Sequence, residues 1–342
     1  MTQIVTRNRH SLHNYWQKEL ADVITSVDEL LELVGLNPDD YVEDRKAKQL
    51  FALRVPRYFA SLIEPNNPAD PLLRQVLPMH QEFIEMPGFT SDPLQEQQGP
   101  VPGLLHKYTN RVLLIVRGGC AINCRYCFRR HFPYQDNAPG SHGWQAAIDY
   151  IAQRTEINEV IFSGGDPLMA NDRHLAKLIH ALAEIPHLKR LRIHSRLPVV
   201  IPSRITNELV ELLAKCRLKT ILVTHINHPN EVSQTLTEAL KPLKSRGIWL
   251  LNQSVLLAGV NDDAQTLANL SEALFASDIQ PYYLHLLDKV TGATHFDVSH
   301  QDAVAIMHQL YELLPGFLIP RLVREEPHKP SKTPQDLGLS LL

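Results

Sequence analysis

From residue 111 onward, short apolar runs alternate with longer amphipathic stretches. The apolar runs cover 112–116, 160–162, 191–193, 220–223, 248–251 and 279–284, and after a longer first gap they start about thirty residues apart. Between them, the stretches 174–185, 205–213 and 264–275 carry apolar residues at helical spacing. Strand and helix alternating at this interval is typical of the βαβ units of a parallel sheet. The pattern therefore predicts six βα units and a further strand at 317–323, which suits an open doubly wound sheet or a partial barrel.

The two ends of the chain follow other patterns. Residues 1–105 are polar, and Ser26 to Glu29 have the spacing of a capping box before a run of leucines. The stretch 87–103 is rich in Gly, Pro and Gln and is predicted to be a connector, and 326–342 shows no periodicity. We therefore expect a helical N-terminal region at 1–105, an α/β domain at 106–325 and a C-terminal segment at 326–342.

Composition narrows the class of protein. The 342 residues are 44% apolar and 21% charged, as in globular enzymes, and the formal net charge is only −3. Such a balance gives no chain-wide electrostatic attraction to nucleic acid. No apolar run reaches the ~18–20 residues of a membrane helix, and the first residues lack the apolar stretch of a secretory signal. These features predict a cytoplasmic protein without nucleic-acid or membrane partners; they leave a homo-oligomer open.

Three of the four cysteines lie within eight positions. Cys120, Cys124 and Cys127 form a Cys-x3-Cys-x2-Cys motif directly after the first predicted strand, where α/β barrels place their chemistry. A 4Fe-4S cluster held by three thiolates keeps one iron open for a ligand. A structural zinc needs four protein ligands, and His131 or Cys216 would supply the fourth. The motif therefore predicts a cluster-bearing enzyme, with a zinc-stabilised binding module as the alternative.

The cysteine motif, with Tyr126 before its last cysteine, resembles that of the radical S-adenosylmethionine (SAM) enzymes. Their open iron binds SAM, and one electron from the cluster cleaves SAM into methionine and a 5′-deoxyadenosyl radical. Ser163-Gly164-Gly165-Asp166-Pro167 ends the second predicted strand and resembles the glycine-rich segment that receives the SAM amino group. Glycines allow a close backbone approach to a ligand, so Gly164, Gly165 and Asp166 are predicted to bind SAM.

Further blocks resemble one branch of these enzymes, the lysine 2,3-aminomutases. The matches are collinear from about residue 80 to 335 and include 105–112, 127–130, 195–200, 224–231 and 252–257. The resemblance implies a partial TIM-type barrel and a second cofactor, pyridoxal 5′-phosphate (PLP). Within the blocks, positions that match cofactor-binding residues are Lys107, Tyr108, Arg111, His225 and Gln253.

The resemblance also places the lysine that carries PLP. In the family this lysine follows a glycine-rich stretch and precedes Thr-Pro. Here the stretch 327–334 lacks the glycines, but Pro327 and Thr333-Pro334 keep Lys332 in register. Lys332 is therefore the predicted catalytic lysine, and Lys329 is its rival. A radical SAM enzyme without PLP, acting on another substrate, is the alternative reading of this segment.

Three more residues match the family's substrate site. Arg129 matches the arginine that binds the substrate α-carboxylate, a task that suits a bidentate guanidinium. Asp288 and Glu325 follow the sixth and the last predicted strands and match two acids that bind the ε-ammonium group; the second position is Asp in the family. Two acids at these strand ends favour lysine over glutamate as the substrate.

The resemblance implies a radical aminomutase that converts α-lysine to β-lysine with the help of a one-electron reductant. The short C-terminal segment and the altered 327–332 stretch resemble the branch that supplies β-lysine for modifying elongation factor P, to which a ligase attaches it. An aminomutase acting on another amino acid and a catabolic lysine aminomutase are the alternatives.

Overall fold

The centre of the computed structural model, which describes residues 15–135 and 143–338, is one nine-stranded sheet with its strands in sequence order. Strands β2 to β8 are parallel, and the edge strands β1 and β9 pair antiparallel with β2 and β8. The strands are β1 (Leu104–Tyr108), β2 (Arg111–Arg117), β3 (Glu159–Gly164), β4 (Arg190–Ser195), β5 (Lys219–His225), β6 (Trp249–Val255), β7 (Gln280–His285), β8 (Arg321–Arg324) and β9 (Thr333–Pro334). Because β1 and β9 do not pair with each other, the described strands form an open, partial barrel, as predicted.

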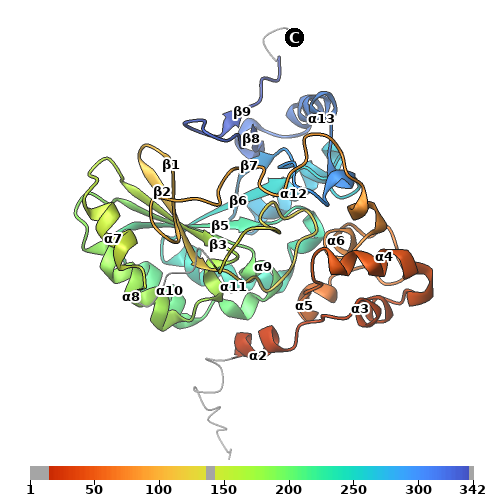
Figure 1. Ribbon diagram of the computed structural model, residues 1–342, viewed down its shortest axis with the longest axis horizontal. Helices are drawn as coiled ribbons and strands as arrows, with labels where there is room; N and C mark the ends of the chain where they lie inside the picture. Colours follow the sequence, from red (N-terminus) through yellow and green to blue (C-terminus); the bar gives the residue numbers. More distant parts are fainter. Residues whose placement is uncertain (1–14, 136–142, 339–342) are drawn as a thin grey trace, which may run out of the picture.

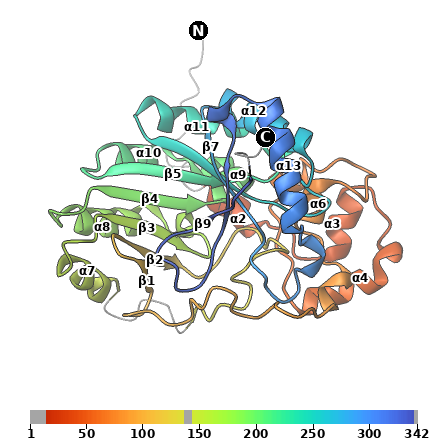
Figure 2. The same ribbon diagram turned by 90° about the horizontal axis from the view of Figure 1, so that it is seen from above.

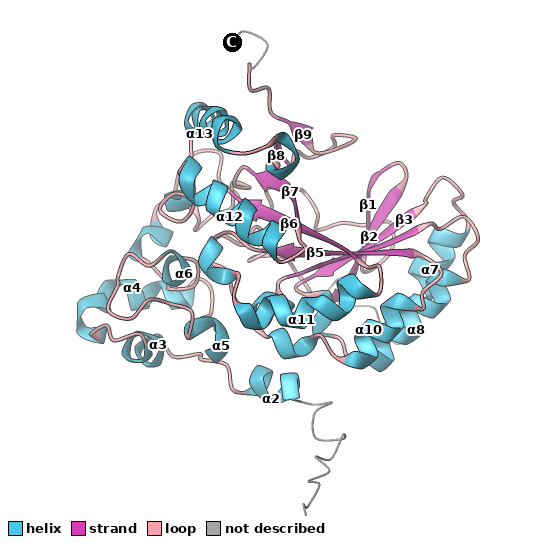
Figure 3. Ribbon diagram, turned by 180° about the vertical axis from the view of Figure 1, so that it is seen from behind, coloured by secondary structure: helices cyan, strands magenta, loops and turns pink. Residues whose placement is uncertain are grey.

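Helices cover the outer side of the curved sheet, as Figures 1 and 3 show. Those of the barrel are α7 (Gln145–Ala152), α8 (Asp172–Ala183), α9 (Leu197–Val200), α10 (Asn207–Ala214), α11 (Gln234–Ser245), α12 (Ala264–Ala276) and α13 (His300–Leu313). Five of them begin at a side-chain cap that accepts a hydrogen bond from a first-turn N–H: Asn171, Thr206, Ser233, Asp263 and Ser299. Each such cap contributes about 1 kcal/mol, so the sequence marks where these helices start.

The predicted strands and helices agree with the observed ones to within a few residues, with one exception. The expected last strand at 317–323 begins only at Arg321, because Gly316–Leu318 form a 3-10 turn, η8. Phe317 in this turn is exposed and packs its ring against that of Phe275 at the end of α12. The apolar character of 317–320 therefore reflects a packed turn rather than a strand.

The N-terminal region folds as short helices beside the barrel. They are α2 (Tyr15–Ala21), α3 (Val27–Leu33), α4 (Val42–Lys46), α5 (Arg57–Ala60) and α6 (Pro71–Arg74). Helices α3 to α6 lie on the side of the molecule away from α7, whereas α2 lies nearer the middle (Figures 1 and 2). Ser26 caps α3 through the predicted contact with the Glu29 N–H. Buried residues of this region, such as Leu30 and Leu72, belong to the same hydrophobic cluster as Leu191 of β4. The predicted boundary at 105 falls inside β1, so the two regions share one sheet edge and one core.

The C-terminal segment returns to the sheet rather than leaving it. Val323 pairs with Pro334 and Arg324 with Thr333, which places β9 against the edge of β8. The Gln335 N–H also donates to the Leu322 carbonyl at 3.0 Å. Lys332 is thereby fixed beside the barrel opening, although its sequence surroundings show no periodicity.

Candidate active site

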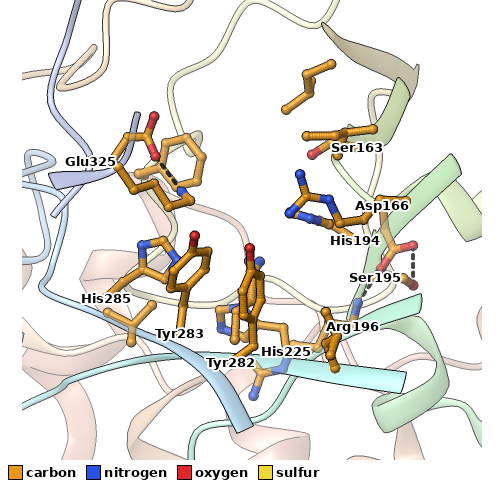
Figure 4. A pocket seen from close by; sticks show the side chains of 18 of the residues that line it. Ser163, Asp166, His194, Ser195, Arg196, His225, Tyr282, Tyr283, His285 and Glu325 are labelled. Carbon is orange, nitrogen blue, oxygen red and sulfur yellow. Dashed lines mark hydrogen bonds and ion pairs between the residues drawn. The ribbon is translucent and has the colours of Figure 1, made fainter. Parts of the chain in front are cut away.

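The parallel strands surround a cavity of about 830 Å³ inside the barrel, which reaches from their carboxyl ends to the first residues of β6 and β7 (Figure 4). Every site residue predicted from the sequence contributes to its lining: Lys107, Tyr108, Arg111, Cys120, Cys124, Cys127, Arg129, Gly164, Gly165, Asp166, His225, Gln253, Asp288, Glu325 and Lys332. Residues between positions 107 and 332 therefore meet around a single cavity. Their individual roles stay predictions.

The cysteine loop follows β2 and is held in place by the N-terminal region. The Asn123 N–H donates to the Arg54 carbonyl and the Arg125 N–H to the Gln75 carbonyl, both at 2.9 Å. The fully buried Arg125 guanidinium forms two hydrogen bonds of 2.7 and 2.6 Å with the Glu82 carboxylate. Glu82 also accepts from Arg130 at 2.7 Å. Residues between and just after the cysteines are thus hydrogen-bonded to the N-terminal region. These contacts hold the loop in place and leave the thiols uninvolved.

The three thiols suit an iron–sulfur cluster by chemistry and position. All three are free and line the cavity. Burial raises the pKa of Cys120 well above its usual value and that of Cys127 to about 11. Arg196 Nη1 lies 2.7 Å from Cys124 Sγ and donates to it. Metal binding therefore has to displace protons from Cys120 and Cys127. At Cys124, the positively charged Arg196 guanidinium favours the thiolate that would bind the metal.

The glycines of the second motif are required by the cysteine loop itself. A Cβ on Gly164 would lie 2.3 Å from the Arg117 carbonyl oxygen, and one on Gly165 would lie 2.5 Å from that of Gly119. Gly164 also has a φ of 124°, which side-chain-bearing residues rarely adopt. The Gly165 N–H donates to the Arg117 carbonyl at 2.8 Å. The segment therefore holds the end of β3 against the loop that carries Cys120.

Asp166 joins two strands of the sheet. Its buried carboxylate accepts hydrogen bonds from the Ser195 hydroxyl at 2.8 Å, and from the Leu168, Arg196 and Leu197 N–H groups at 2.8–2.9 Å. Burial raises the pKa of Asp166, while these donors lower it. With four internal donors, the carboxylate anchors the turn after β4 to β3, and its contact with SAM stays a prediction.

A buried polar network behind Cys124 includes residues that the sequence analysis did not single out. Arg196 donates to Tyr126 Oη at 2.6 Å, Gln75 Oε1 at 2.7 Å and Glu231 Oε2 at 2.9 Å. The Tyr126 hydroxyl lies 3.0 Å from His225 Nε2, and their rings stack. Arg196 and Glu231 lie in two of the matching blocks, so the blocks were the only signal for them. The network connects a cysteine to His225, which is predicted to bind a cofactor.

An alternating chain of charges forms part of the lining of the cavity. Arg129 pairs with Glu96, Glu96 with Lys107, Lys107 with Glu325, and Glu325 with Lys332. Tyr108 donates a further hydrogen bond to Glu325. Burial raises the pKa of Glu325, but Lys332 and Lys107 outweigh it and lower the value to about 2. One predicted substrate acid, Glu325, thus pairs with two lysines that are predicted to bind the cofactor.

Asp288 forms no ion pair with this chain of charges among the described residues. Burial raises its pKa to about 7, although Lys332 lowers it. Its Oδ1 is buried and has no hydrogen-bond partner among the described residues; the same is true of His194 Nε2 and His285 Nε2. All three residues line the cavity, and Figure 4 shows His285 below Glu325. Unpaired buried polar atoms of this kind indicate a cavity built for a polar ligand.

The described residues contain neither a site for a single metal ion nor a membrane-spanning helix. No three His, Cys, Asp or Glu side chains within 15–135 and 143–338 are arranged to hold a single metal ion. In the same part of the chain, no helix is both long and apolar enough to cross a membrane. Cys216 is 89 positions from Cys127 in the sequence. Its side chain packs against the main hydrophobic cluster.

The chain is similar to proteins of known family. A family model, "Radical SAM superfamily", matches residues 114–270. The "L-lysine 2,3-aminomutase" of Escherichia coli (strain K12) is 57% identical over 340 residues, which cover 99% of each chain. The chain belongs to the lysine 2,3-aminomutase family of radical SAM enzymes. Another member, the "L-lysine 2,3-aminomutase" of Clostridium subterminale, is 37% identical over 94% of this chain and 77% of its own. The solved structure "Native anSMEcpe with bound AdoMet and Cp18Cys peptide" aligns with a TM-score of 0.46 at 14% identity, over 67% of this chain and 74% of that one.

Membership of the lysine 2,3-aminomutase family confirms the family predicted from the motifs and favours an isomerase over a zinc-binding module. Radical SAM enzymes use a 4Fe-4S cluster and SAM, and the thiols of Cys120, Cys124 and Cys127 fit that cluster. Three thiolates from one loop are also the ligand number that leaves one iron accessible.

Proposed function

We propose that the chain converts α-lysine to β-lysine, using SAM, a 4Fe-4S cluster and PLP. The observation that carries this proposal is the arrangement of charges around one cavity. Asp288 and Glu325 lie at the ends of β7 and β8, whereas Arg129 follows the cysteine loop and contacts Ser163 of β3. Figure 4 shows Glu325 and Ser163 on opposite sides of the cavity. Lysine carries an ammonium group and a carboxylate at its two ends, so it matches this separation.

PLP fits the side of the cavity formed by β1, β2 and β9. Lys107, Tyr108 and Arg111 lie on the β1–β2 hairpin and offer donors for a phosphate, and Arg111 stacks on the Tyr108 ring at 4.1 Å. Lys332 is partly buried and pairs with Glu325, whereas Lys329 is exposed. These contacts favour Lys332 over Lys329 as the lysine that binds the cofactor. When bound, PLP would stabilise the migrating nitrogen, and SAM with the cluster would supply the abstracting radical.

The chain's own residues bind, orient and shield the substrate. Arg129 holds the α-carboxylate, and the two acids hold the ε-ammonium, so the carbon atoms between them are fixed relative to the cysteine loop. The apolar side chains of Leu287 and Ile161 also line the cavity and help exclude water from a reactive radical. A pair of acids at the remote end disfavours glutamate, which would place a carboxylate there.

The biological setting is proposed from the resemblance alone. We propose that the chain acts in the cytoplasm, takes its electron from a one-electron reductant and supplies β-lysine to a ligase that modifies elongation factor P. A catabolic role for the β-lysine is the alternative. Mass measurement of elongation factor P in cells with and without the gene distinguishes the two, because only the first role predicts loss of the added mass.

Anaerobic incubation with lysine, SAM, PLP and a reductant tests the reaction directly. The expected result is β-lysine by chromatography, with SAM regenerated rather than consumed in proportion to product. Omission of PLP is the matched control: product formed at the full rate without PLP would favour the PLP-free alternative. Glutamate and alanine as substrates test the specificity, and equal rates with either would contradict the assignment to lysine.

A further inference from the structure

Glu96 is a buried acid in a stretch that the sequence predicts to be only a connector. Its side chain is 6% exposed, and its neighbour Leu94 is buried too. Asp92 Oδ1 accepts the Glu96 N–H at 3.1 Å, and Gln95 adopts a φ of 52°, so the backbone turns here. The connector therefore inserts one carboxylate into the lining of the cavity.

Each oxygen of this carboxylate binds a different cation. Oε2 accepts from Arg129 Nε at 2.8 Å and lies 2.7 Å from Arg129 Nη2, whereas Oε1 accepts from Lys107 Nζ at 3.1 Å. Burial raises the pKa of Glu96, but Arg129 and Lys107 outweigh it and lower the value. Glu96 is therefore an anion shared by one residue predicted to bind the substrate and one predicted to bind PLP.

The contact also determines which edge of the Arg129 guanidinium faces a substrate. Glu96 occupies the Nε–Nη2 edge, and Nη1 donates to Ser163 Oγ at 3.0 Å and to the Gly164 carbonyl at 3.3 Å. A guanidinium binds a carboxylate most strongly with two parallel N–H donors. With the first edge taken, the uncommitted donor is the second N–H of Nη2, on the Nη1–Nη2 edge. A substrate carboxylate that binds this edge with two N–H donors takes that group and replaces one of the Nη1 contacts, to Ser163 or Gly164, in an orientation that Glu96 fixes.

We propose that Glu96 is a positioning residue that sets the carboxylate-binding edge of Arg129 and couples it to the PLP-binding Lys107. The inference deepens the proposed function and rests on it. Lys107 and Arg129 come from different parts of the barrel, β1 and the cysteine loop, and Glu96 is the described side chain that contacts both. Loss of its charge frees both cations to move and leaves two buried positive charges without their shared partner.

Glu96→Gln tests the proposal, and Glu85→Gln, the same change at an exposed acid of the preceding segment, is the matched control. In Glu96→Gln we expect the KM for lysine to rise about tenfold or more, the effect of weakening a charge-assisted hydrogen bond, and PLP to bind more weakly. The KM for SAM and the iron content stay at the wild-type level. Glu85→Gln behaves as the wild type in all four measurements.

A competitor without a carboxylate separates positioning of Arg129 from general damage to the cavity. Cadaverine carries both amino groups of lysine but no carboxylate, so at saturating PLP its inhibition constant is expected to be the same in wild type and Glu96→Gln. Glu96→Asp keeps the charge but is one methylene shorter, and it is expected to recover part of the lysine affinity. If Glu96→Gln does not fold, the KM of Glu96→Asp for lysine, compared with its inhibition constant for cadaverine, tests the proposal instead.

Several results would overturn the proposal. They are an unchanged lysine KM in Glu96→Gln, an equal loss of affinity for lysine and cadaverine, or loss of iron and folding in both the Gln and the Asp variants, which would make Glu96 merely structural. A wild-type chain that forms no β-lysine counts instead against the proposed function, so the two failures are distinguishable.

Discussion

At the scale of single residues, burial gives the two predicted ammonium-binding acids different charge states. Two lysines keep Glu325 ionised, whereas burial raises the pKa of Asp288 to about 7. Below that pH Asp288 is protonated and attracts an ammonium weakly; above it the carboxylate is charged. We therefore expect kcat/KM for lysine to rise about tenfold per pH unit up to about 7 and then level off.

Asp288→Asn serves as the test of that pH dependence. Removing one member of a buried charge pair costs about 3–5 kcal/mol, which corresponds to a loss of about 100-fold or more in kcat/KM for lysine. The step near pH 7 is expected to disappear at the same time, while the KM for SAM stays unchanged. A variant that keeps the step would show that another group titrates there.

The choice between two lysines is also made at the residue scale. Lys332 pairs with Glu325 inside the cavity and lies 5.9 Å from the centre of the Tyr283 ring, whereas Lys329 is exposed. Borohydride reduction of the PLP-loaded protein is expected to leave the pyridoxyl group on Lys332, as located by peptide mapping. Lys332→Ala loses this label and keeps the iron–sulfur absorbance, and Lys329→Ala keeps both. A label on Lys329 would contradict the assignment.

At the scale of elements, the cysteine loop depends on the N-terminal region. Glu82, in the 3-10 turn η3 (His80–Phe83), is the common acceptor for Arg125 and Arg130 on either side of Cys127. Glu82→Gln removes the charge that both guanidinium groups share, so we expect lower iron content after anaerobic reconstitution and a lower melting temperature. Glu43→Gln is the control, because Glu43 pairs with Lys46 on the exposed surface. Normal iron content in Glu82→Gln would show that the loop holds its shape without this contact.

The same scale shows why some elements were predictable and others were not. Helices such as α8 repeat apolar residues with helical spacing and begin at a capping side chain, so their sequence alone identifies them. β1 and β9 are short edge strands with mixed polarity, and nothing in 104–108 or 333–334 repeats. The burial of Glu96 could not be predicted from the residues around it either. It depends on contacts with Arg129 and Lys107, which are 33 and 11 positions away in the sequence. The motifs therefore predicted which side chains meet in the cavity, but not the acid that connects them.

At the scale of the whole molecule, the N-terminal region and the barrel share one hydrophobic core. A single hydrophobic cluster contains Trp16 and Leu30 from the first helices together with Phe162 and Leu222 from the sheet. The Arg204 guanidinium, from the turn after β4, is fully buried and lies over the Trp16 ring at 4.7 Å. Separating the two regions would expose apolar surface at about 25 cal/mol per Å² and leave Arg204 without its aromatic partner.

One core of this kind predicts one cooperative unfolding transition. The chain has three tryptophans, so replacing Trp144 and Trp249 with Phe leaves Trp16 as the sole fluorescent reporter of the N-terminal region. Far-ultraviolet circular dichroism of the same variant reports mainly on the barrel, which holds most of the helices and strands. We expect both signals to change at the same denaturant concentration, since a shared core couples the two regions. A fluorescence change at clearly lower denaturant concentration would mean that the first helices detach before the barrel unfolds. In such an intermediate, the Glu82 contact would be too weak to hold the cysteine loop.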